Sequence, residues 1–243
     1  MSVTAIIQAR CGSTRFPDKV FALIDGKPLL WHVVNRLKYS KTINEIVVAT
    51  TTNQLDDKIE EWCSANKVNC FRGSEADVLN RYFCASNAFP SDYIVRITAD
   101  DPFKEPSVID EVVRTLIDEG LDYVTNNYPP SFPEGLDCEA FTKKTLANME
   151  ANATEPVERE HVTQYIFRHL NEFKIKNISC GKMLKHHRWT IDTMQDYEYV
   201  VAIYAARKSK KGLLLMNEIL SILEDNPSIS NINSSVQRSL MYK

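Results

Sequence analysis

Short runs rich in valine and isoleucine alternate with longer segments of helical periodicity through the first half of the chain. The apolar runs are residues 3–8, 45–49, 69–71 and 93–98, and continuous runs of this kind suit strands that are covered on both faces. The segments between them, residues 28–40, 55–66, 76–89 and 106–119, carry apolar side chains at helical spacing. This alternation predicts an α/β fold, a three-layer α/β/α sandwich around a mostly parallel sheet.

The pattern loosens between residues 123 and 141, where proline, asparagine and glycine cluster in NNYPPSFPEGLD. A helical segment at 158–170 and an extended segment at 173–179 follow, and residues 123–180 are predicted to be an insertion that serves as a substrate lid or a dimer arm. Two further helices, at 194–209 and 212–224, close a single domain of residues 1–243. The polar residues from 226 onward are predicted to form a mobile tail.

Composition excludes several classes of protein. The 243 residues are 44% hydrophobic and carry 29 basic against 32 acidic side chains, a net charge of -3, which does not suit a protein that coats nucleic acid or an anionic membrane. No signal peptide and no apolar stretch of about 20 residues is recognisable, so we expect a cytoplasmic protein without membrane insertion. Six scattered cysteines without a CxxC pair argue against a zinc site and a disulfide scaffold.

A basic loop, QARCGSTRFPDK, follows the first predicted strand. A loop at the carboxyl end of such a strand can direct backbone N–H groups and cations at one polyphosphate. The loop is neither a GxGxxG nor a GxxxxGK[ST] motif, which removes the main support for those two phosphate-binding folds. A solvated basic turn is the alternative, but the position at the first β–α junction favours an anion site. The candidate ligands are Gln8, Ala9, Arg10, Gly12, Ser13, Arg15 and Lys19.

Two acidic motifs complete the pattern. RITADDP, residues 96–102, places Asp100 and Asp101 at the end of the fourth predicted strand, on the same edge as the basic loop. Carboxylates there need a cation before they can approach phosphate, and Mg²⁺ is the natural one; a plain surface turn is the alternative. In RWTIDTMQDYEYV, residues 188–200, composition alone makes Asp192 or Thr193 a helix N-cap.

The segment QARCGSTRFPDKVFALIDGKPLLWHVVNRL resembles the opening of the cytidylyltransferases that make CMP-activated sugar acids, which has the form ARxxSxRxPxK. It is especially similar to the spore-coat polysaccharide biosynthesis type, and the resemblance extends over residues 5–206. It implies a nucleotide-diphospho-sugar-transferase-like fold, a homodimer, CTP as substrate, and Mg²⁺ held by Asp100 and Asp192. These two aspartates, with Arg10, Arg15 and Lys19, are then the expected catalytic residues.

Base and acceptor recognition depend more heavily on this resemblance. CFRGSEADVLNRYFCA, residues 70–85, resembles the nucleotide-base region of the family, with Arg72 and Asp77 as candidate ligands. Asp77 is explained nearly as well as a first-turn acid of a helix. PEGLDCEAF and EREHVTQYI offer Asp137, Glu139, Arg159 and His161 as acceptor ligands. This region does not follow the ketodeoxyoctonate or acylneuraminate enzymes, so neither sugar is implied.

The sequence therefore predicts attack of an acceptor hydroxyl on the α-phosphorus of CTP, with release of pyrophosphate. Two other classes of function remain open. One is an enzyme of the same architecture that uses another nucleoside triphosphate with a sugar phosphate, or a glycosyltransferase that consumes an activated sugar. The other is a nucleotide-binding protein without catalysis, against which the presence of both Asp100 and Asp192 counts.

Overall fold

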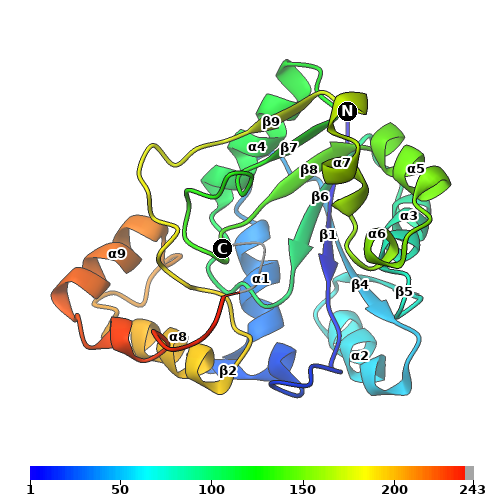
Figure 1. Ribbon diagram of the computed structural model, residues 1–243. Helices are drawn as coiled ribbons and strands as arrows, with labels where there is room; N and C mark the ends of the chain where they lie inside the picture. Colours follow the sequence, from blue (N-terminus) through cyan, green and yellow to red (C-terminus); the bar gives the residue numbers. More distant parts are fainter. Residues whose placement is uncertain (239–243) are drawn as a thin grey trace.

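A computed structural model describes residues 1–238 and shows a seven-stranded sheet with helices on both faces (Figure 1). The strand order is β5-β4-β1-β6-β8-β7-β9, and β8 runs antiparallel to both of its neighbours. The predicted three-layer, mostly parallel architecture is confirmed. The strands are β1 (Val3–Gln8), β4 (Glu45–Thr51), β5 (Asn69–Gly73), β6 (Tyr93–Thr98), β7 (Tyr123–Thr125), β8 (Glu139–Thr142) and β9 (Ile175–Asn177).

The pairing of β1 with its two neighbours brings the sequence motifs together. β1 lies between β4 and β6 and is parallel to both, with Gln8 opposite Ala49 on one side and Thr98 on the other. Parallel strands end at the same edge of a sheet, so the loop after β1 and the acidic turn after β6 leave side by side.

Side chains of the central strands alternate between two apolar clusters. Val3, Ala5 and Ile7 of β1 pack into the larger cluster, whereas Ile6 points into the smaller one. The larger cluster includes buried residues of α1 (Leu29–Leu37), α2 (Asp57–Ala65), α4 (Pro106–Asp118), α8 (Met194–Ala206) and α9 (Met216–Asp225). The smaller includes residues of α3 (Val78–Ala88), α5 (Lys143–Asn152) and α7 (Gln164–Arg168). Each fully buried aliphatic side chain contributes about 1.5–3 kcal/mol, so both faces stabilise the sheet.

The second half of the chain differs from the sequence-based expectation in several elements. Within residues 123–141, β7 and β8 form strands of the main sheet, so the loosened pattern does not mark a break in it. The predicted helix at 158–170 is two short helices, α6 (Pro156–Glu160) and α7, separated by residues 161–163, of which His161 is extended. Helix α5 was not predicted.

The polar C-terminal segment is packed, not mobile, as far as residue 238. Ile229 lies in the main core and is 9% exposed. The Asn233 side-chain amide donates to the carbonyl of Arg188 and to Oδ1 of Asp196, at 3.1 Å each. The prediction of a mobile tail is therefore wrong for residues 226–238, and residues 239–243 lie outside the described part of the chain.

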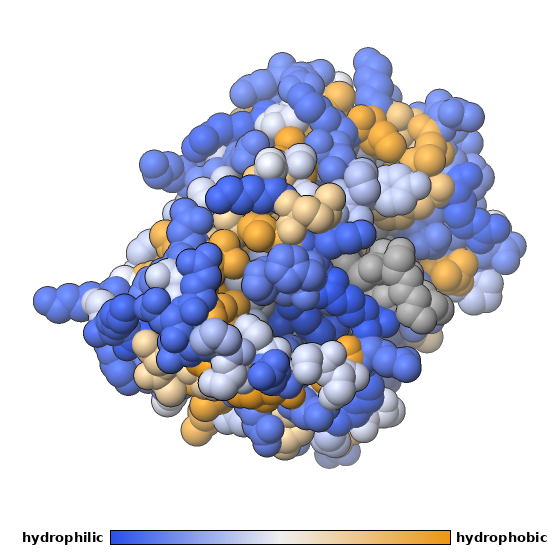
Figure 2. Space-filling model, turned by 60° about the vertical axis from the view of Figure 1, so that its left-hand side comes forward, coloured by the Kyte–Doolittle hydropathy of each residue, from blue (hydrophilic) through white to orange (hydrophobic). Residues whose placement is uncertain are grey.

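Among residues 1–238, no helix combines the length and the apolar character needed to cross a membrane. Figure 2 shows one face of the molecule, on which most residues are hydrophilic and the hydrophobic ones form small, separate groups.

Gly135, in the loop between β7 and β8, provides a test of the close packing against the backbone of Trp189 and Thr190. Its φ is +103°, and a Cβ there would lie 2.8 Å from the backbone nitrogen of Thr190 and 2.9 Å from the carbonyl carbon of Trp189. We expect Gly135→Ala to lower the free energy of unfolding by at least about 2 kcal/mol, because backbone atoms must shift. Gly120→Ala is the control, since its φ is +60° with open space around it, and we expect a cost of about 1 kcal/mol. Equal urea midpoints for the two variants would contradict this packing.

Candidate active site

A cavity of about 1040 Å³ opens at the carboxyl edge of β1 and β6. Its wall combines the loop after β1, the turn leading into α3, the end of β6, helix α6 and Asp192, which lies just before α8. The lining residues include Gln8, Ala9, Arg10, Gly12, Ser13, Arg15, Lys19, Glu75, Asp77, Arg81, Thr98, Asp100, Arg159, Glu160, His161 and Asp192. The basic loop and both acidic motifs therefore meet in one place.

The loop after β1 is held by a buried carboxylate that the sequence did not point to. Asp56, 2% exposed, accepts from the backbone N–H of Cys11 at 2.7 Å and from the hydroxyl of Thr51. On its other side, Phe16 packs edge-on against Tyr197 of α8, with ring centroids 5.6 Å apart. The loop is thus fixed at both ends while the side chains of Arg10 and Arg15 stay half-exposed at the cavity.

Lys19 lies between the two predicted metal ligands. Its Nζ donates to Oδ2 of Asp100 at 2.9 Å, to Oδ1 of Asp192 at 2.9 Å and to the carbonyl of Ile191 at 2.8 Å. Burial alone lowers the pKa of Lys19, but attraction to the two aspartates outweighs it and the pKa lies above its ordinary value. Burial likewise raises the pKa of Asp100, and Lys19 outweighs that effect, so this carboxyl stays ionised.

The two carboxylates converge on one cation from positions 92 residues apart. Their chemistry fits a hard divalent cation, which takes oxygen ligands. Among residues 1–238, no cluster of three or more histidines, cysteines, aspartates or glutamates forms a metal cage. A cation at Asp100 and Asp192 therefore needs water or phosphate oxygens to complete its coordination, as is usual where Mg²⁺ binds together with a nucleotide.

One cavity residue has an unused hydrogen-bonding atom. The Gln8 side-chain oxygen is buried and accepts no hydrogen bond from any of the described residues, although buried polar atoms are nearly always paired. Gln8 lines the cavity, so a ligand donor would satisfy this oxygen once the side chain turns toward the cavity.

The two residues predicted to read the base are engaged with the protein. The Arg72 guanidinium donates to the carbonyls of Thr51 and Asn53 at 2.9 Å each and contacts the carboxylates of Asp57 and Glu60. Arg72 thus fastens β5 to its neighbours and is not among the cavity residues, so the structure does not place it against a base.

Asp77 lines the cavity, but it is the N-cap of α3. It accepts from the backbone N–H of Asn80 at 2.9 Å and from the Arg159 guanidinium at 2.7–3.1 Å. Asp77 therefore caps the helix, one position before the first turn in which the sequence-based alternative placed it.

The predicted acceptor residues do not form one set. Arg159 and His161 line the cavity, and His161 is exposed at its rim. The donors of Arg159 are occupied by Asp77 and by both the carboxylate and the carbonyl of Glu150. Asp137 lies outside the cavity wall, where its carbonyl accepts from buried Lys104.

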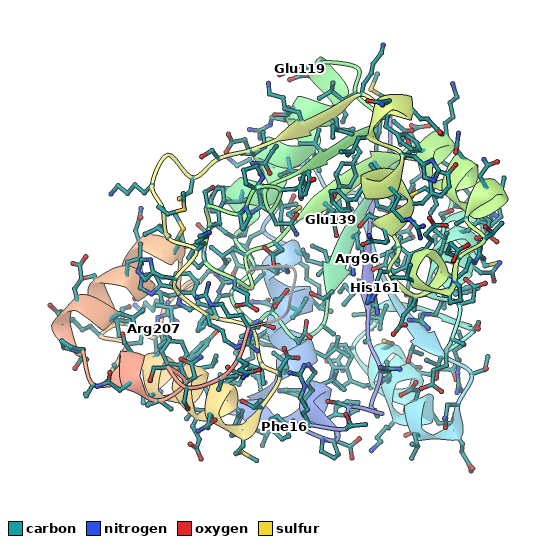
Figure 3. The ribbon with its side chains drawn as sticks, viewed as in Figure 1. Phe16, Arg96, Glu119, Glu139, His161 and Arg207 are labelled. Atoms are coloured by element: carbon teal, nitrogen blue, oxygen red, sulfur yellow. The ribbon has the colours of Figure 1, made fainter. Side chains whose placement is uncertain are left out.

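Glu139 is part of a buried network, not of the cavity surface. It is 4% exposed, pairs with Arg96, and accepts from the hydroxyls of Tyr123 at 2.5 Å and Thr163 at 2.7 Å. Burial raises the pKa of Glu139, but Arg96 and the hydroxyl donors outweigh it and the pKa is lowered. Figure 3 shows Arg96, Glu139 and His161 gathered at the centre of the view, and the prediction that Glu139 binds sugar hydroxyls finds no support in this arrangement.

The fold and this cavity define an α/β nucleotidyltransferase, and comparison with known proteins identifies the class. The chain belongs to the cytidylyltransferase family, whose sequence model matches residues 4–233. It is therefore a nucleotidyltransferase that uses CTP.

Individual relatives match the chain over almost its whole length. An uncharacterized protein of Methanocaldococcus jannaschii is 38% identical, over 98% of this chain and 97% of its own. The spore coat polysaccharide biosynthesis protein SpsF of Bacillus subtilis is 32% identical, over 91% of this chain and 94% of its own. The solved structure of a cytidylyltransferase from Leptospira borgpetersenii superposes with a TM-score of 0.89 at 33% identity, covering 98% of this chain and 99% of that one.

Removing the Lys19 ammonium group, which lies between Asp100 and Asp192, should destabilise the protein in a pH-dependent way. The lowered pKa of Asp100 means that its stabilising contribution is present above the ordinary value of 3.8 and is lost as the pH falls through the folded-state value. We expect Lys19→Met to cost about 1–3 kcal/mol in urea unfolding at pH 7, with the gap to wild type shrinking below pH 4. Lys58→Met, which removes an exposed partner of Asp18, should stay close to wild type. A gap that is independent of pH would contradict the charge pairing.

Glu139→Gln tests whether this residue is structural. The change leaves Arg96 without its buried counter-charge, and we expect it to lower the free energy of unfolding by about 2–4 kcal/mol. Glu119→Gln is the matched control, because Glu119 pairs with Lys176 at an exposed site far from the cavity (Figure 3). A Glu139→Gln protein that is as stable as the Glu119→Gln control, but has a raised KM for the acceptor, would restore Glu139 as a substrate ligand.

Proposed function

We propose that this cytidylyltransferase transfers CMP from CTP to a hydroxyl of a sugar acid, releases pyrophosphate and supplies surface polysaccharide biosynthesis. The observation that carries the proposal is that Asp100 and Asp192 meet at the Lys19 ammonium group, in the cavity beside a basic loop. The similarity of the loop to enzymes that make CMP-activated sugar acids supports the acceptor class. The relationship to a spore coat polysaccharide biosynthesis protein supports the pathway.

The cation that we propose at Asp100 and Asp192 is Mg²⁺. When bound, it neutralises phosphate oxygens and orients the triphosphate for in-line attack. Arg10 and Arg15, whose side chains are 51% and 59% exposed beside the cavity, bind the phosphate oxygens. Lys19 pairs with both carboxylates, so it would add a further positive charge beside a metal held by them.

Nucleotide and acceptor are assigned to different residues of the cavity wall. The unpaired side-chain oxygen of Gln8 accepts from an amino or hydroxyl donor of the nucleotide. His161, at the rim and without the ion pairs that occupy Arg159, is the remaining candidate among the predicted acceptor ligands. The carboxylate and hydroxyls of a sugar acid are suitable partners for an imidazole.

The proposed enzyme works in the cytoplasm as a homodimer. The cytoplasm supplies CTP, and the resemblance to the sugar-acid cytidylyltransferases supports the dimer. Residues 123–180, which contribute β7, β8 and β9 at one edge of the sheet, are the proposed dimerisation and acceptor-binding region.

Asp100→Asn tests the catalytic role directly. We expect the variant to fold normally and to lose about 10²–10³-fold or more in the rate of pyrophosphate release from CTP and Mg²⁺ with a panel of sugar acids, because the cation is no longer held. Asp118→Asn, at the exposed end of α4, should keep wild-type activity. Normal activity in Asp100→Asn would refute the proposal. Release of a nucleoside diphosphate would identify a glycosyltransferase, and preference for another triphosphate with a sugar phosphate would exclude the sugar-acid acceptor.

A further inference from the structure

The two oxygens of the Asp192 carboxylate have different partners. Oδ1 faces the cavity, where it contacts Lys19 at 2.9 Å and Arg15 at 3.1 Å. Oδ2 faces the protein and accepts from Nη2 of Arg188 at 2.9 Å. Arg188 therefore pairs with one oxygen of Asp192, and the other oxygen contacts the basic side chains of the cavity.

Arg188 is itself held rigidly. It is 5% exposed, its Nε and Nη2 donate to the two oxygens of Asp196 at 2.9 and 3.1 Å, and its Nη1 donates to Glu134 at 2.5 Å. Asp196, in the first turn of α8, also accepts from the backbone N–H groups of Asp192 and Thr193 at 3.1 and 3.0 Å. The side chain and the backbone of Asp192 are thus fixed by the same buried group of charges.

The C-terminal segment forms hydrogen bonds with this group of charged residues. Asn233, 7% exposed, donates at 3.1 Å both to the carbonyl of Arg188 and to Oδ1 of Asp196. Figure 1 shows the end of the described chain returning from α9 past α8 to the middle of the molecule. A segment that looks like a polar tail in the sequence therefore forms part of the support behind the cavity.

We propose that Arg188 is a positioning residue that orients the Asp192 carboxylate toward the cation. We propose that Asn233, through its hydrogen bonds to Arg188 and Asp196, contributes to the same orientation. The proposal rests on the proposed function in one respect, namely that Asp192 holds a divalent cation. A carboxylate without such a support samples several rotamers, and replacement of the groups that orient a metal ligand commonly weakens metal binding about 10–100-fold.

The test measures Mn²⁺ binding to the full chain by electron paramagnetic resonance, with CTP present and no acceptor, so that no turnover occurs. Arg188→Lys keeps one positive charge but cannot reach three carboxylates at once, and we expect its Kd for Mn²⁺ to rise about 10–100-fold. Its Kd for CTP without metal should remain within about twofold of wild type. Asn233→Ala, which leaves every ion pair of Arg188 in place, should show a smaller rise in the same direction.

Arg36→Lys is the matched control. Arg36 is 2% exposed, donates to the carbonyls of Lys104 and Leu214 and contacts Glu105 outside the cavity wall. The Arg36→Lys protein should be less stable than wild type and keep the wild-type affinity for Mn²⁺. Wild-type Mn²⁺ affinity in both Arg188→Lys and Asn233→Ala, or an equal loss in Arg36→Lys, would overturn the positioning role. If Arg188→Lys does not fold, Asn233→Ala decides. Failure of the wild-type protein to bind Mn²⁺ with CTP would instead overturn the proposed function, and this inference with it.

Discussion

The parallel pairing of β1 with β6 is the constraint on which the rest of the active-site edge depends. With Gln8 opposite Thr98, the loop after β1 and the acidic turn after β6 start at neighbouring positions, and Lys19 reaches Asp100 directly. The backbone N–H of Ile191 then bonds to the carbonyl of Asp100 at 2.9 Å and brings Asp192 to the same ammonium group. Segments that are remote in sequence are thereby joined at one charged point.

Paired charges surround this point. Arg96 with Glu139, Lys104 with Asp101, and Arg188 with Asp192 and Asp196 are all at least half-buried. Removing such charges from water is costly unless each one is paired, so most ionic side chains near the cavity are committed to the protein. This explains why several residues of suitable chemistry for a ligand serve structural roles, while Arg10, Arg15 and His161 remain exposed at the cavity.

The predictions from the sequence are correct where a local pattern of side chains is compatible with only one kind of element. Strands β1 and β6 were predicted with their observed bounds, because buried parallel strands are continuous apolar runs. They fail for β7 and β8, which have three and four residues; runs this short carry little periodicity, and their membership of the sheet comes from pairing with distant strands. The helix expected at 158–170 is divided at residues 161–163, where the Thr163 hydroxyl donates to Glu139 of strand β8.

By itself, the sequence determined the α/β class, the basic loop, the two acidic motifs and, through resemblance, the family that the comparisons confirmed. These features are encoded by residues close together in the chain. Only the tertiary structure decided that Arg72, Asp77, Glu139 and Arg159 are bound to the protein, and that Asn233 supports Arg188 behind Asp192. The physical reason is that the role of a charged or amide group is set by which partners fold against it, and those partners lie as far as 82 residues away along the chain.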